Sequence, residues 1–267
     1  MSWWQALILG VVQGLTEFLP VSSSGHLTIG QALLNVQFEE GDMLLFDVMV
    51  HAATVCSTLL VLWRPVAQLL QGTFLTPQWN TEKQYVGKIL LSMIPVFVVG
   101  VWFKDYVEAI FGSGLLVVGI CLMVTAALLC FAQFARPRHK EIISWWDSLI
   151  IGVAQACAVL PGLSRSGTTI ATGILLGNKR ESVAQFSFLM VLIPILGQTL
   201  LSVLDILQGD VVTHLSLTAM LTGFVSAFVV GALACRWMLE IVKRQKLIYF
   251  AVYCLVLGTF AIVYEFC

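Results

Sequence analysis

Six long apolar runs limit what this chain can fold into. They cover about residues 44–63, 86–104, 114–134, 184–206, 215–236 and 247–266, and each approaches the roughly 20 residues that a helix needs to cross a bilayer. Only 11% of the 267 residues are charged, whereas about 25% are charged in soluble domains. The runs do not alternate with period two, which argues against barrel strands. The sequence therefore predicts an all-α integral membrane protein, with a bundle of six transmembrane helices in a single membrane domain over residues 1–267.

A second feature is a segment that occurs twice. The copy that begins at Trp3 reads WWQALILGVVQGLTEFLPVSSSGH, and the copy that begins at Trp145 reads WWDSLIIGVAQACAVLPGLSRSGT. At the same offset Gln13 aligns with Gln155. Each copy ends in a polar loop rich in serine and glycine, inside an otherwise apolar chain. Such a duplicated polar loop indicates where the function of a membrane protein resides.

The repeated segments differ from the six runs because their arms are short. In the first copy an apolar arm over residues 3–19 stops at Pro20. The second arm, about residues 25–34, gives only about 15 Å of helix, half the hydrocarbon thickness. We therefore predict two re-entrant helical hairpins, which enter the membrane, turn at depth and leave on the same side. Irregular backbone at that depth has to be buried in protein or line a wet cavity.

The distribution of basic residues predicts the orientation. If neither hairpin crosses, 12 of the 14 Lys and Arg residues fall on one side, Lys104 falls on the other, and Arg165 lies in a hairpin loop. The positive-inside rule makes the basic side cytoplasmic and places both termini on the outer face. The 12 residues are Arg64, Lys83, Lys88, Arg136, Arg138, Lys140, Lys179, Arg180, Arg236, Lys243, Arg244 and Lys246.

This topology divides the chain into two inverted repeats. Residues 1–140 and 141–267 would each contain a re-entrant hairpin followed by three spans, and three is odd, so the second copy is upside down. Inverted repeats bring their irregular loops together near the midplane. We therefore expect Glu17 and His26 of the first hairpin to meet Arg165 and its neighbouring serines of the second in one site.

The loops have the composition of an anion site. Both lead into a short helix, whose free N–H groups, together with serine hydroxyls, favour phosphate. Arg165 adds a planar, two-pronged cation, although it could instead pair with Glu17 as an internal brace. The residues expected to contact substrate are Ser22, Ser24, Gly25, Ser164, Ser166, Gly167, Thr168 and Thr169.

Individual roles follow from the chemistry of the side chains. Glu17 can hold a divalent cation or orient a water, or it can merely satisfy the loop backbone. His26 can exchange a proton with the reacting phosphate, or be a core histidine bonded to its loop. Ser23 is a possible nucleophile with Glu17 or His26 as its base, and a hydrogen-bonding role is equally open. Asp47 and His51, at i and i+4, either support the site or form a local pair.

Two motifs give the chain a family resemblance. The stretch QGLTEFLPVSSSGH, residues 13–26, and the stretch PGLSRSGTT, residues 161–169, resemble the two signatures of the bacitracin-resistance family of undecaprenyl-diphosphate phosphatases. The first signature, (E/Q)xxxE, is present as Gln13 and Glu17. The second, PGxSRSxxT, matches at every fixed position. The similarity extends along the whole chain.

The resemblance implies hydrolysis of a C55 polyprenyl diphosphate, undecaprenyl diphosphate, to the monophosphate and inorganic phosphate. This reaction recycles the lipid carrier for peptidoglycan synthesis and confers bacitracin resistance. The family also implies a divalent cation, Mg²⁺ or Ca²⁺. Because Gln13 takes the amide option of its signature, a second metal-binding carboxylate would come from elsewhere, such as Asp47. The residues that the resemblance marks as functional are Glu17, Ser23, His26 and Arg165, with Ser164 and Thr169 in the same pocket.

The resemblance also sets the expected surroundings. It implies a multi-pass protein of the bacterial plasma (inner) membrane whose site opens to the outer face. The expected partners are the lipid substrate and the bilayer, with no nucleic acid, and the sequence leaves the oligomeric state open. A polyprenyl-phosphate transporter or flippase is the alternative, since inverted repeats with re-entrant loops are also a transporter architecture.

Overall fold

A computed structural model describes residues 1–36, 38, 41–103, 106, 110, 114–135, 140–208, 215–244 and 246–266. Within these residues the chain is helical, and the only strand-like feature is an isolated bridge between Lys140 and Asn178. The helices are α1 (Trp3–Phe18), α2 (Ser23–Leu33), α3 (Asp42–Val61), α4 (Trp63–Phe74), α5 (Thr81–Trp102), α7 (Leu115–Phe134), α8 (Trp145–Cys157), α9 (Arg165–Leu175), α10 (Arg180–Met190), α11 (Leu192–Gln208), α12 (Leu217–Lys243) and α13 (Ile248–Phe266).

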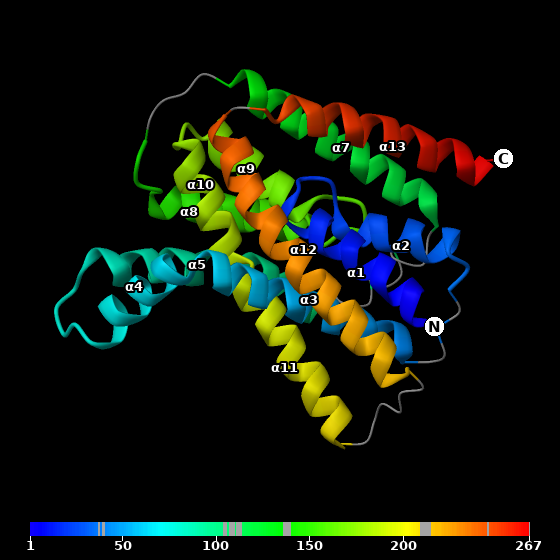
Figure 1. The fold of residues 1–267 in the computed structure, drawn as a ribbon. Coiled ribbons are helices and arrows are strands. Elements are labelled where there is room, and N and C mark those ends of the chain that lie inside the picture. Colours follow the sequence, from blue (N-terminus) through cyan, green and yellow to red (C-terminus); the bar gives the residue numbers. More distant parts are fainter. Residues whose placement is uncertain are drawn as a thin grey trace.

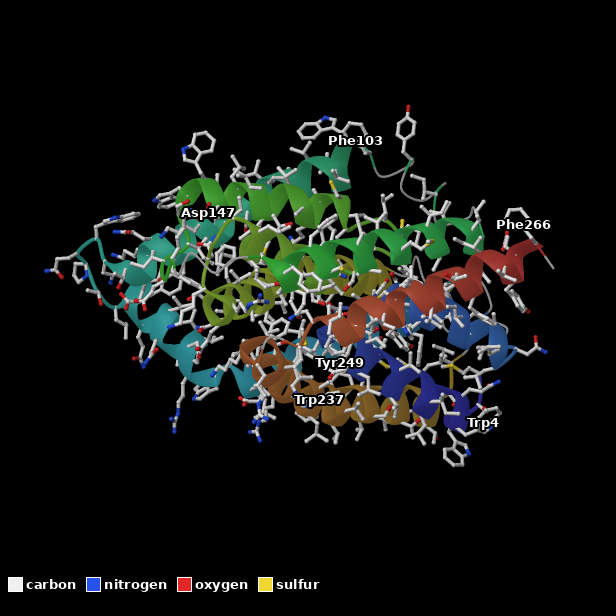
Figure 2. The ribbon with its side chains drawn as sticks, turned by 90° about the horizontal axis from the view of Figure 1, so that it is seen from above. Trp4, Phe103, Asp147, Trp237, Tyr249 and Phe266 are labelled. Carbon is white, nitrogen blue, oxygen red and sulfur yellow. The ribbon has the colours of Figure 1, made fainter. Side chains whose placement is uncertain are left out.

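Six helical stretches are long and apolar enough to cross a membrane, which confirms the predicted number of spans. They are Asp42–Val61, Thr81–Trp102, Leu115–Phe134, Arg180–Gly197, Leu217–Lys243 and Ile248–Phe266. Many large apolar side chains on these helices and on α1 remain exposed, as a lipid-facing surface requires. In Figure 2, Trp4, Trp237 and Phe266 project outward from the ribbon. Lys104, Arg136 and Arg138, which entered the orientation argument, lie outside the described residues.

Two details of the helix pattern differ from the prediction. The run at about 184–206 is divided at Val191 into α10 and α11, because Pro194 has no N–H and fits only the first turn of a new helix. Helix α4 was not predicted. None of its side chains is buried, and Trp63 and Phe74 at its ends are exposed. A surface helix that is short and partly polar lacks the long apolar run by which a membrane span is predicted from sequence.

The repeated segments place their polar loops inside the bundle, while one face of α1 and of α8 stays exposed. Helices α7 and α13 pack side by side, and α12 lies across α1 and α3, with the loops of the α1–α2 and α8–α9 pairs between these two layers (Figure 1). Each repeat begins in the same way, since Ser2 caps α1 and Ser144 caps α8 through a capping box. The two polar loops are therefore held within the protein.

Glycine permits the closest helix crossings. A Cβ atom added to Gly10 of α1 would lie 2.4 Å from the carbonyl oxygen of Gly223 in α12. A Cβ added to Gly152 of α8 would lie 2.4 Å from the carbonyl oxygen of Ser92 in α5. Gly10 and Gly152 occupy the same position in the duplicated segment. Both copies thus use one glycine to bring the first hairpin arm against a helix of the other half of the chain.

Candidate active site

Both polar loops are built by the same hydrogen bonds. The Oγ atom of Ser22 caps α2 by accepting from the N–H of Gly25 at 3.4 Å, and the Oγ atom of Ser164 caps α9 by accepting from the N–H of Gly167 at 3.1 Å. In each loop a second hydroxyl lies next to the capping one. The Ser24 hydroxyl is 3.3 Å from that of Ser22, and the Ser166 hydroxyl is 3.4 Å from that of Ser164. A cap satisfies one N–H of the first turn and leaves others for a ligand.

The tips of the two loops touch each other. The hydroxyl of Ser166 donates to the carbonyl oxygen of Leu19 at 3.2 Å. A Cβ atom on Gly167 would lie 3.2 Å from Cβ of Pro20, and one on Gly25 would lie 3.5 Å from Cα of Gly162. The structure therefore brings the two hairpins together, as the repeat predicted.

A small cavity lies where the hairpins meet. Glu17 from the first hairpin and Arg165, Ser166 and Thr169 from the second all line it. Among the residues that the structure describes, the Arg165 side chain has no hydrogen bond and no ion pair within 4.0 Å, so the direct brace with Glu17 is not formed. The full lining is Glu17, Phe18, Thr54, Val55, Thr58, Gln155, Arg165, Ser166, Thr169, Ser187, Phe188, Val191, Leu192 and Ile195.

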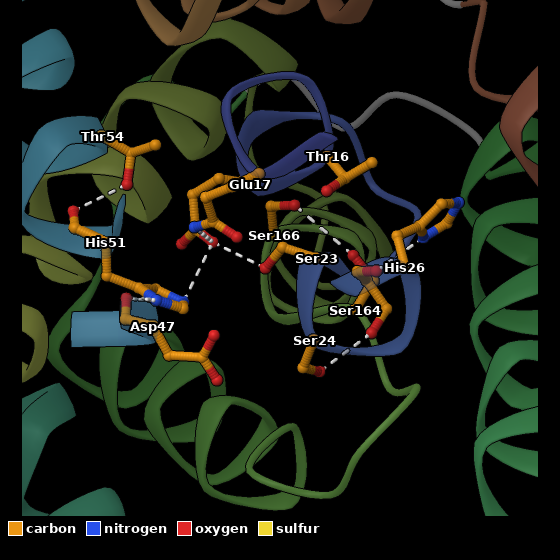
Figure 3. Close-up of polar contacts among 12 residues, drawn as sticks. Thr16, Glu17, Ser23, Ser24, His26, Asp47, His51, Thr54, Ser164 and Ser166 are labelled. Carbon is orange, nitrogen blue, oxygen red and sulfur yellow. Dashed lines mark hydrogen bonds and ion pairs between the residues drawn. The ribbon is translucent and has the colours of Figure 1, made fainter. Parts of the chain in front are cut away.

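The Glu17 carboxylate is the centre of the polar contacts. Its Oε2 atom accepts from Ser23 Oγ at 2.7 Å and from Gln13 Nε2 at 3.1 Å, and lies 3.7 Å from His51 Nε2. Figure 3 shows Glu17 between His51 and Ser23. A 2.7 Å separation is typical of a hydroxyl that donates to a carboxylate. In this arrangement Glu17 can take the proton of Ser23, so the pair has the geometry of a nucleophile and its base.

His26 does not face this carboxylate. Its Nδ1 lies 2.7 Å from the carbonyl oxygen of Ser22, and its Nε2 lies 2.7 Å from the hydroxyl of Tyr253 in α13. The ring is turned away from Glu17 (Figure 3) and does not line the cavity. The expectation that His26 shares the cavity is therefore not met. Tyr253 could not be found from the sequence, because it lies 227 residues away in an apolar run without a motif.

The pairing of Asp47 and His51 also takes a different form. His51 Nδ1 lies 2.7 Å from the backbone carbonyl oxygen of Asp47, not from its carboxylate. A carbonyl only accepts, so Nδ1–H donates to it, and the Nε2 edge of the ring faces Glu17. Asp47 and His51 could either support the site or form only a local pair. The contact of His51 with Glu17 favours a role in supporting the site.

The carboxylate of Glu17 and the oxygen atoms of two neighbouring side chains match the needs of a hard cation. Asp47 Oδ1 and Gln13 Oε1 are both buried, and neither has a partner among the described residues. Mg²⁺ and Ca²⁺ bind oxygen, and Mg²⁺ sites often combine one or two carboxylates with oxygens of a bound phosphate. No cluster of three His, Cys, Asp or Glu side chains with metal-binding geometry is found in the described part of the chain. Glu17, Asp47 and Gln13 are therefore the side chains that would offer oxygen donors to such a cation.

The remaining predicted residues support the loops from within. Ser164 is buried, and its N–H donates to Thr125 Oγ1 at 3.0 Å. Thr168 is buried, and its hydroxyl has no partner in the described structure. Thr169 reaches the cavity and is hydrogen bonded to Ser187. Of the predicted substrate contacts, only Ser166 and Thr169 line the cavity; the others shape the two loops.

Sequence reasoning missed several polar residues of the cavity wall. Thr54 and Thr58 lie one turn apart on α3, and Ser187 lies on α10. Thr54 and Thr58 could have been found from the sequence, because they are hydroxyl residues within an apolar run and their spacing places them on one helix face. Gln155 had been noted only as the mirror of Gln13. Its Oε1 atom is also buried without a described partner, like that of Gln13.

Comparison with known proteins gives a consistent result. Residues 6–260 match the family model described as bacitracin resistance protein BacA. A Bacteroides thetaiotaomicron protein named undecaprenyl-diphosphatase is 57% identical over 264 residues, covering 98% of this chain and 99% of its own length. A Parabacteroides distasonis protein of the same name is 59% identical over 259 residues, covering 97% and 96%. A third, from Christiangramia forsetii, is 45% identical over 269 residues, covering 100% and 99%.

Proposed function

Because this chain belongs to the BacA bacitracin-resistance family, we propose that it hydrolyses undecaprenyl diphosphate to undecaprenyl phosphate and inorganic phosphate. It is a multi-pass membrane protein, and its substrate is a polyprenyl diphosphate lipid of the membrane. The product is the carrier used again in peptidoglycan synthesis. Consumption of the diphosphate, which bacitracin sequesters, confers resistance to the antibiotic.

One observation carries the chemical proposal: Ser23 Oγ donates at 2.7 Å to Glu17 Oε2, and the Glu17 side chain lines the cavity that Arg165 also lines. Ser23 Oγ attacks the terminal phosphorus while Glu17 takes its proton. The bond from that phosphorus to the bridging oxygen breaks, and undecaprenyl phosphate leaves with the proton that Glu17 passes to it, which restores the Glu17 carboxylate. A water activated by Glu17 then hydrolyses the phosphoserine to release inorganic phosphate and restore the serine.

The other residues of the site manage charge and position. The guanidinium of Arg165 offers a two-pronged donor to the phosphate oxygens, and the first turns of α2 and α9 add backbone N–H groups. His26 holds the carbonyl of Ser22 and so positions the turn that carries Ser23. This positioning role replaces the expected direct proton transfer from His26, because the Nε2 atom is already bonded to Tyr253.

A divalent cation, Mg²⁺ or Ca²⁺, completes the proposal. Glu17 and Asp47 would hold it with their carboxylates and Gln13 with its amide oxygen, since the unpartnered oxygens of Asp47 and Gln13 are buried beside this site. When bound, the ion supplies Lewis-acid neutralisation of the diphosphate charge. The assignment rests on donor chemistry and on those two unpartnered atoms.

The inverted-repeat architecture belongs to the proposal as well. Residues 1–140 and 141–267 form the two repeats, each with a re-entrant hairpin and three spans. The second arms support this reading, since α2 and α9 each have 11 residues, about 16 Å of helix and too few to cross. The first hairpin arm of each half also packs against a helix of the other half: α1 lies against α12, and α8 lies against α5.

Basic residues support the proposed orientation. Lys140 lies 3.5 Å from Asp147, Lys179 lies 3.7 Å from Glu141, and Lys243 lies 2.8 Å from Glu181. These contacts gather the starts of α8 and α10 and the end of α12 at one end of the bundle. Both chain termini lie at the opposite end (Figure 1). With the basic end in the cytoplasm, the termini are on the outer face. An opening of the site on that same face is what membership of the family implies.

A detergent assay tests the activity. The purified protein is incubated with Mg²⁺ and undecaprenyl or farnesyl diphosphate, and inorganic phosphate is measured. Transport cannot release phosphate in a solution without compartments, so release identifies hydrolysis and not the flippase alternative. Ser23→Ala and Glu17→Gln are expected to lower kcat by about 10³-fold or more. Thr28→Ala, an exposed position on the same helix, is the control. Turnover near that of the unchanged protein in Ser23→Ala would exclude Ser23 as nucleophile.

A further inference from the structure

Lys88 is a cation within a membrane span that has no anion beside it. It belongs to α5, and the residue is only 6% exposed. Within the described part of the chain its one electrostatic contact is with the ring of Trp145, whose centroid lies 5.8 Å from Nζ. Lysines near the end of a span usually extend their ammonium group into water, but a residue so little exposed does not. Because buried charges are normally paired, the chain leaves this one without its counterion.

Trp145 places the ammonium group of Lys88 near the surface of the protein. It is the first residue of α8, and its ring packs against α5, since a Cβ atom on Gly87 would lie 2.8 Å from Cη2 of the ring. Trp145 is 43% exposed. Tryptophan is enriched at the level of the lipid head groups. Lys88 Nζ is therefore within reach of a head group that lies against Trp145.

The start of α8 adds hydrogen-bond donors for the same anion. Ser144 Oγ accepts from the N–H of Asp147 at 3.0 Å, whereas the N–H groups of Trp145 and Trp146 have no partner among the residues that the structure describes. Free N–H groups at a helix start favour an anion. Asp147, the acid of this first turn, lies 3.5 Å from Lys140, which offsets its charge. The charge of Lys88 is thus available to an anion from outside the chain.

The surroundings favour an anion that carries hydrocarbon chains. Beyond the level of Lys88, both α5 and α8 present exposed apolar side chains along the direction in which a lipid tail runs. Acyl chains cover such surfaces, and a free phosphate ion covers none of them. The exposed side chains are Trp146, Ile150 and Val153 on α8 and Leu90 and Ile94 on α5.

We propose that the junction of α5 and α8 binds the phosphate head group of an anionic phospholipid, with Lys88 and the first turn of α8 as its contacts. This lipid is not the substrate, because neither Lys88 nor Trp145 lines the cavity of Glu17 and Arg165. It holds the entrance of the second hairpin against α5. The inference does not depend on the proposed hydrolysis, and its test measures binding instead of turnover.

The test titrates the purified protein in non-ionic detergent with dioctanoyl phosphatidylglycerol and measures Kd by calorimetry. Dioctanoyl phosphatidylcholine, which has the same tails and no net charge, and glycerol 3-phosphate, which has no tails, are titrated in parallel. Lys88→Met removes the charge and keeps the length of the side chain, and Lys88→Arg keeps the charge. Lys246→Met is the matched control, because it removes the same charge from an exposed position between α12 and α13.

The unchanged protein is expected to bind phosphatidylglycerol about 10-fold or more tightly than phosphatidylcholine or glycerol 3-phosphate. Lys88→Met should weaken phosphatidylglycerol binding by about 10-fold, the loss expected for one charge-assisted hydrogen bond, and leave phosphatidylcholine binding unchanged. Lys88→Arg and Lys246→Met should both stay within about threefold of the unchanged protein. The Tm of Lys88→Met without added lipid should not fall, because methionine removes an unpaired charge and keeps the packing.

Four results would overturn the lipid site. Equal affinity for phosphatidylglycerol in Lys88→Met and the unchanged protein would show that Lys88 does not bind the head group. Equal losses in Lys88→Met and Lys246→Met would show a general effect of charge. Binding of glycerol 3-phosphate as tight as that of phosphatidylglycerol would identify a site for a free anion. A lower Tm of Lys88→Met without lipid would show that the ammonium group already has its partner within the protein.

Discussion

The Nε2 atom of His26 lies 2.7 Å from the hydroxyl of Tyr253, and the two rings stack with 5.6 Å between their centroids. On the other side of the imidazole, Nδ1 faces the carbonyl of Ser22, which can only accept. Nδ1 therefore carries the proton, and Nε2 accepts from Tyr253. The contact fixes the residue that caps α2, and Ser22 has the positive φ of 71° that is uncommon outside glycine.

Tyr253→Phe tests whether this contact positions the nucleophile. The substitution keeps the stacked ring and removes one hydrogen bond, worth about 1 kcal/mol, so we expect kcat to fall about fivefold with KM nearly unchanged. Steady-state kinetics on farnesyl diphosphate measure both values. The effect should disappear in a His26→Ala background, because the two residues act through one contact. Additive losses in the double variant would show that Tyr253 acts independently of His26.

The contact between His51 and Glu17 gives a second prediction. His51 Nε2 lies 3.7 Å from the carboxylate oxygen that also accepts from Ser23. His51→Ala removes this neighbour and lets the carboxylate turn away, so kcat should fall about tenfold, in the range for lost positioning. His51→Gln places an amide donor at similar reach and should recover most of the rate. Equal losses in the two variants would mean that His51 contributes only bulk.

The sequence predicted those parts of the structure that follow from patterns repeated along the chain. The apolar runs indicated the six spans, and the duplicated segment indicated the convergence of Glu17 and Arg165. Those features repeat along the chain or obey the dimensions of a bilayer. The contact between Ser23 and Glu17 was also within reach, because only six residues separate them.

The rest depends on packing between distant segments. Tyr253 is 227 residues from His26, and nothing in its apolar surroundings indicates a site. Ser187 was counted among the residues of a membrane span, although its hydroxyl faces Thr169 in the cavity. The helix break at Val191 required knowing that Pro194 begins a helix there and does not bend one. The first two are decided by a tertiary neighbour, and the third by where Pro194 falls in the helix.

Arg165→Lys provides a third prediction. Within the described residues the guanidinium has no hydrogen bond and no ion pair within 4.0 Å, although its positive charge acts on the buried carboxylate of Glu17. Lysine keeps the charge but not the planar fork, and we expect it to lose about 10²-fold or more in kcat/KM, nearly as much as Arg165→Ala. Thermal denaturation in detergent should show little change in Tm for Arg165→Lys, which keeps a positive charge near Glu17. Full activity in Arg165→Lys would mean that charge alone is needed.

The fourth prediction concerns the glycine that brings α8 against α5. In Gly152→Ala the new Cβ atom would lie 2.4 Å from the carbonyl oxygen of Ser92, and backbone atoms cannot give way as a flexible side chain can. We expect a loss of about 1–3 kcal/mol, seen as a lower Tm in detergent. Activity should fall as well, because α8 carries the loop that leads to Arg165.

Gly100→Ala is the matched control for that substitution. Gly100 lies on α5, the helix that Gly152 contacts, and no atom lies within 4 Å of the position its Cβ would take. Alanine is the better helix former by about 1 kcal/mol, so Tm should stay the same or rise. Since the two substitutions add the same methyl group, a lower Tm in Gly152→Ala alone must come from the contact with Ser92. Equal Tm values would mean that α8 can shift away from α5 without loss, and the close crossing would then not be what holds the second hairpin in place.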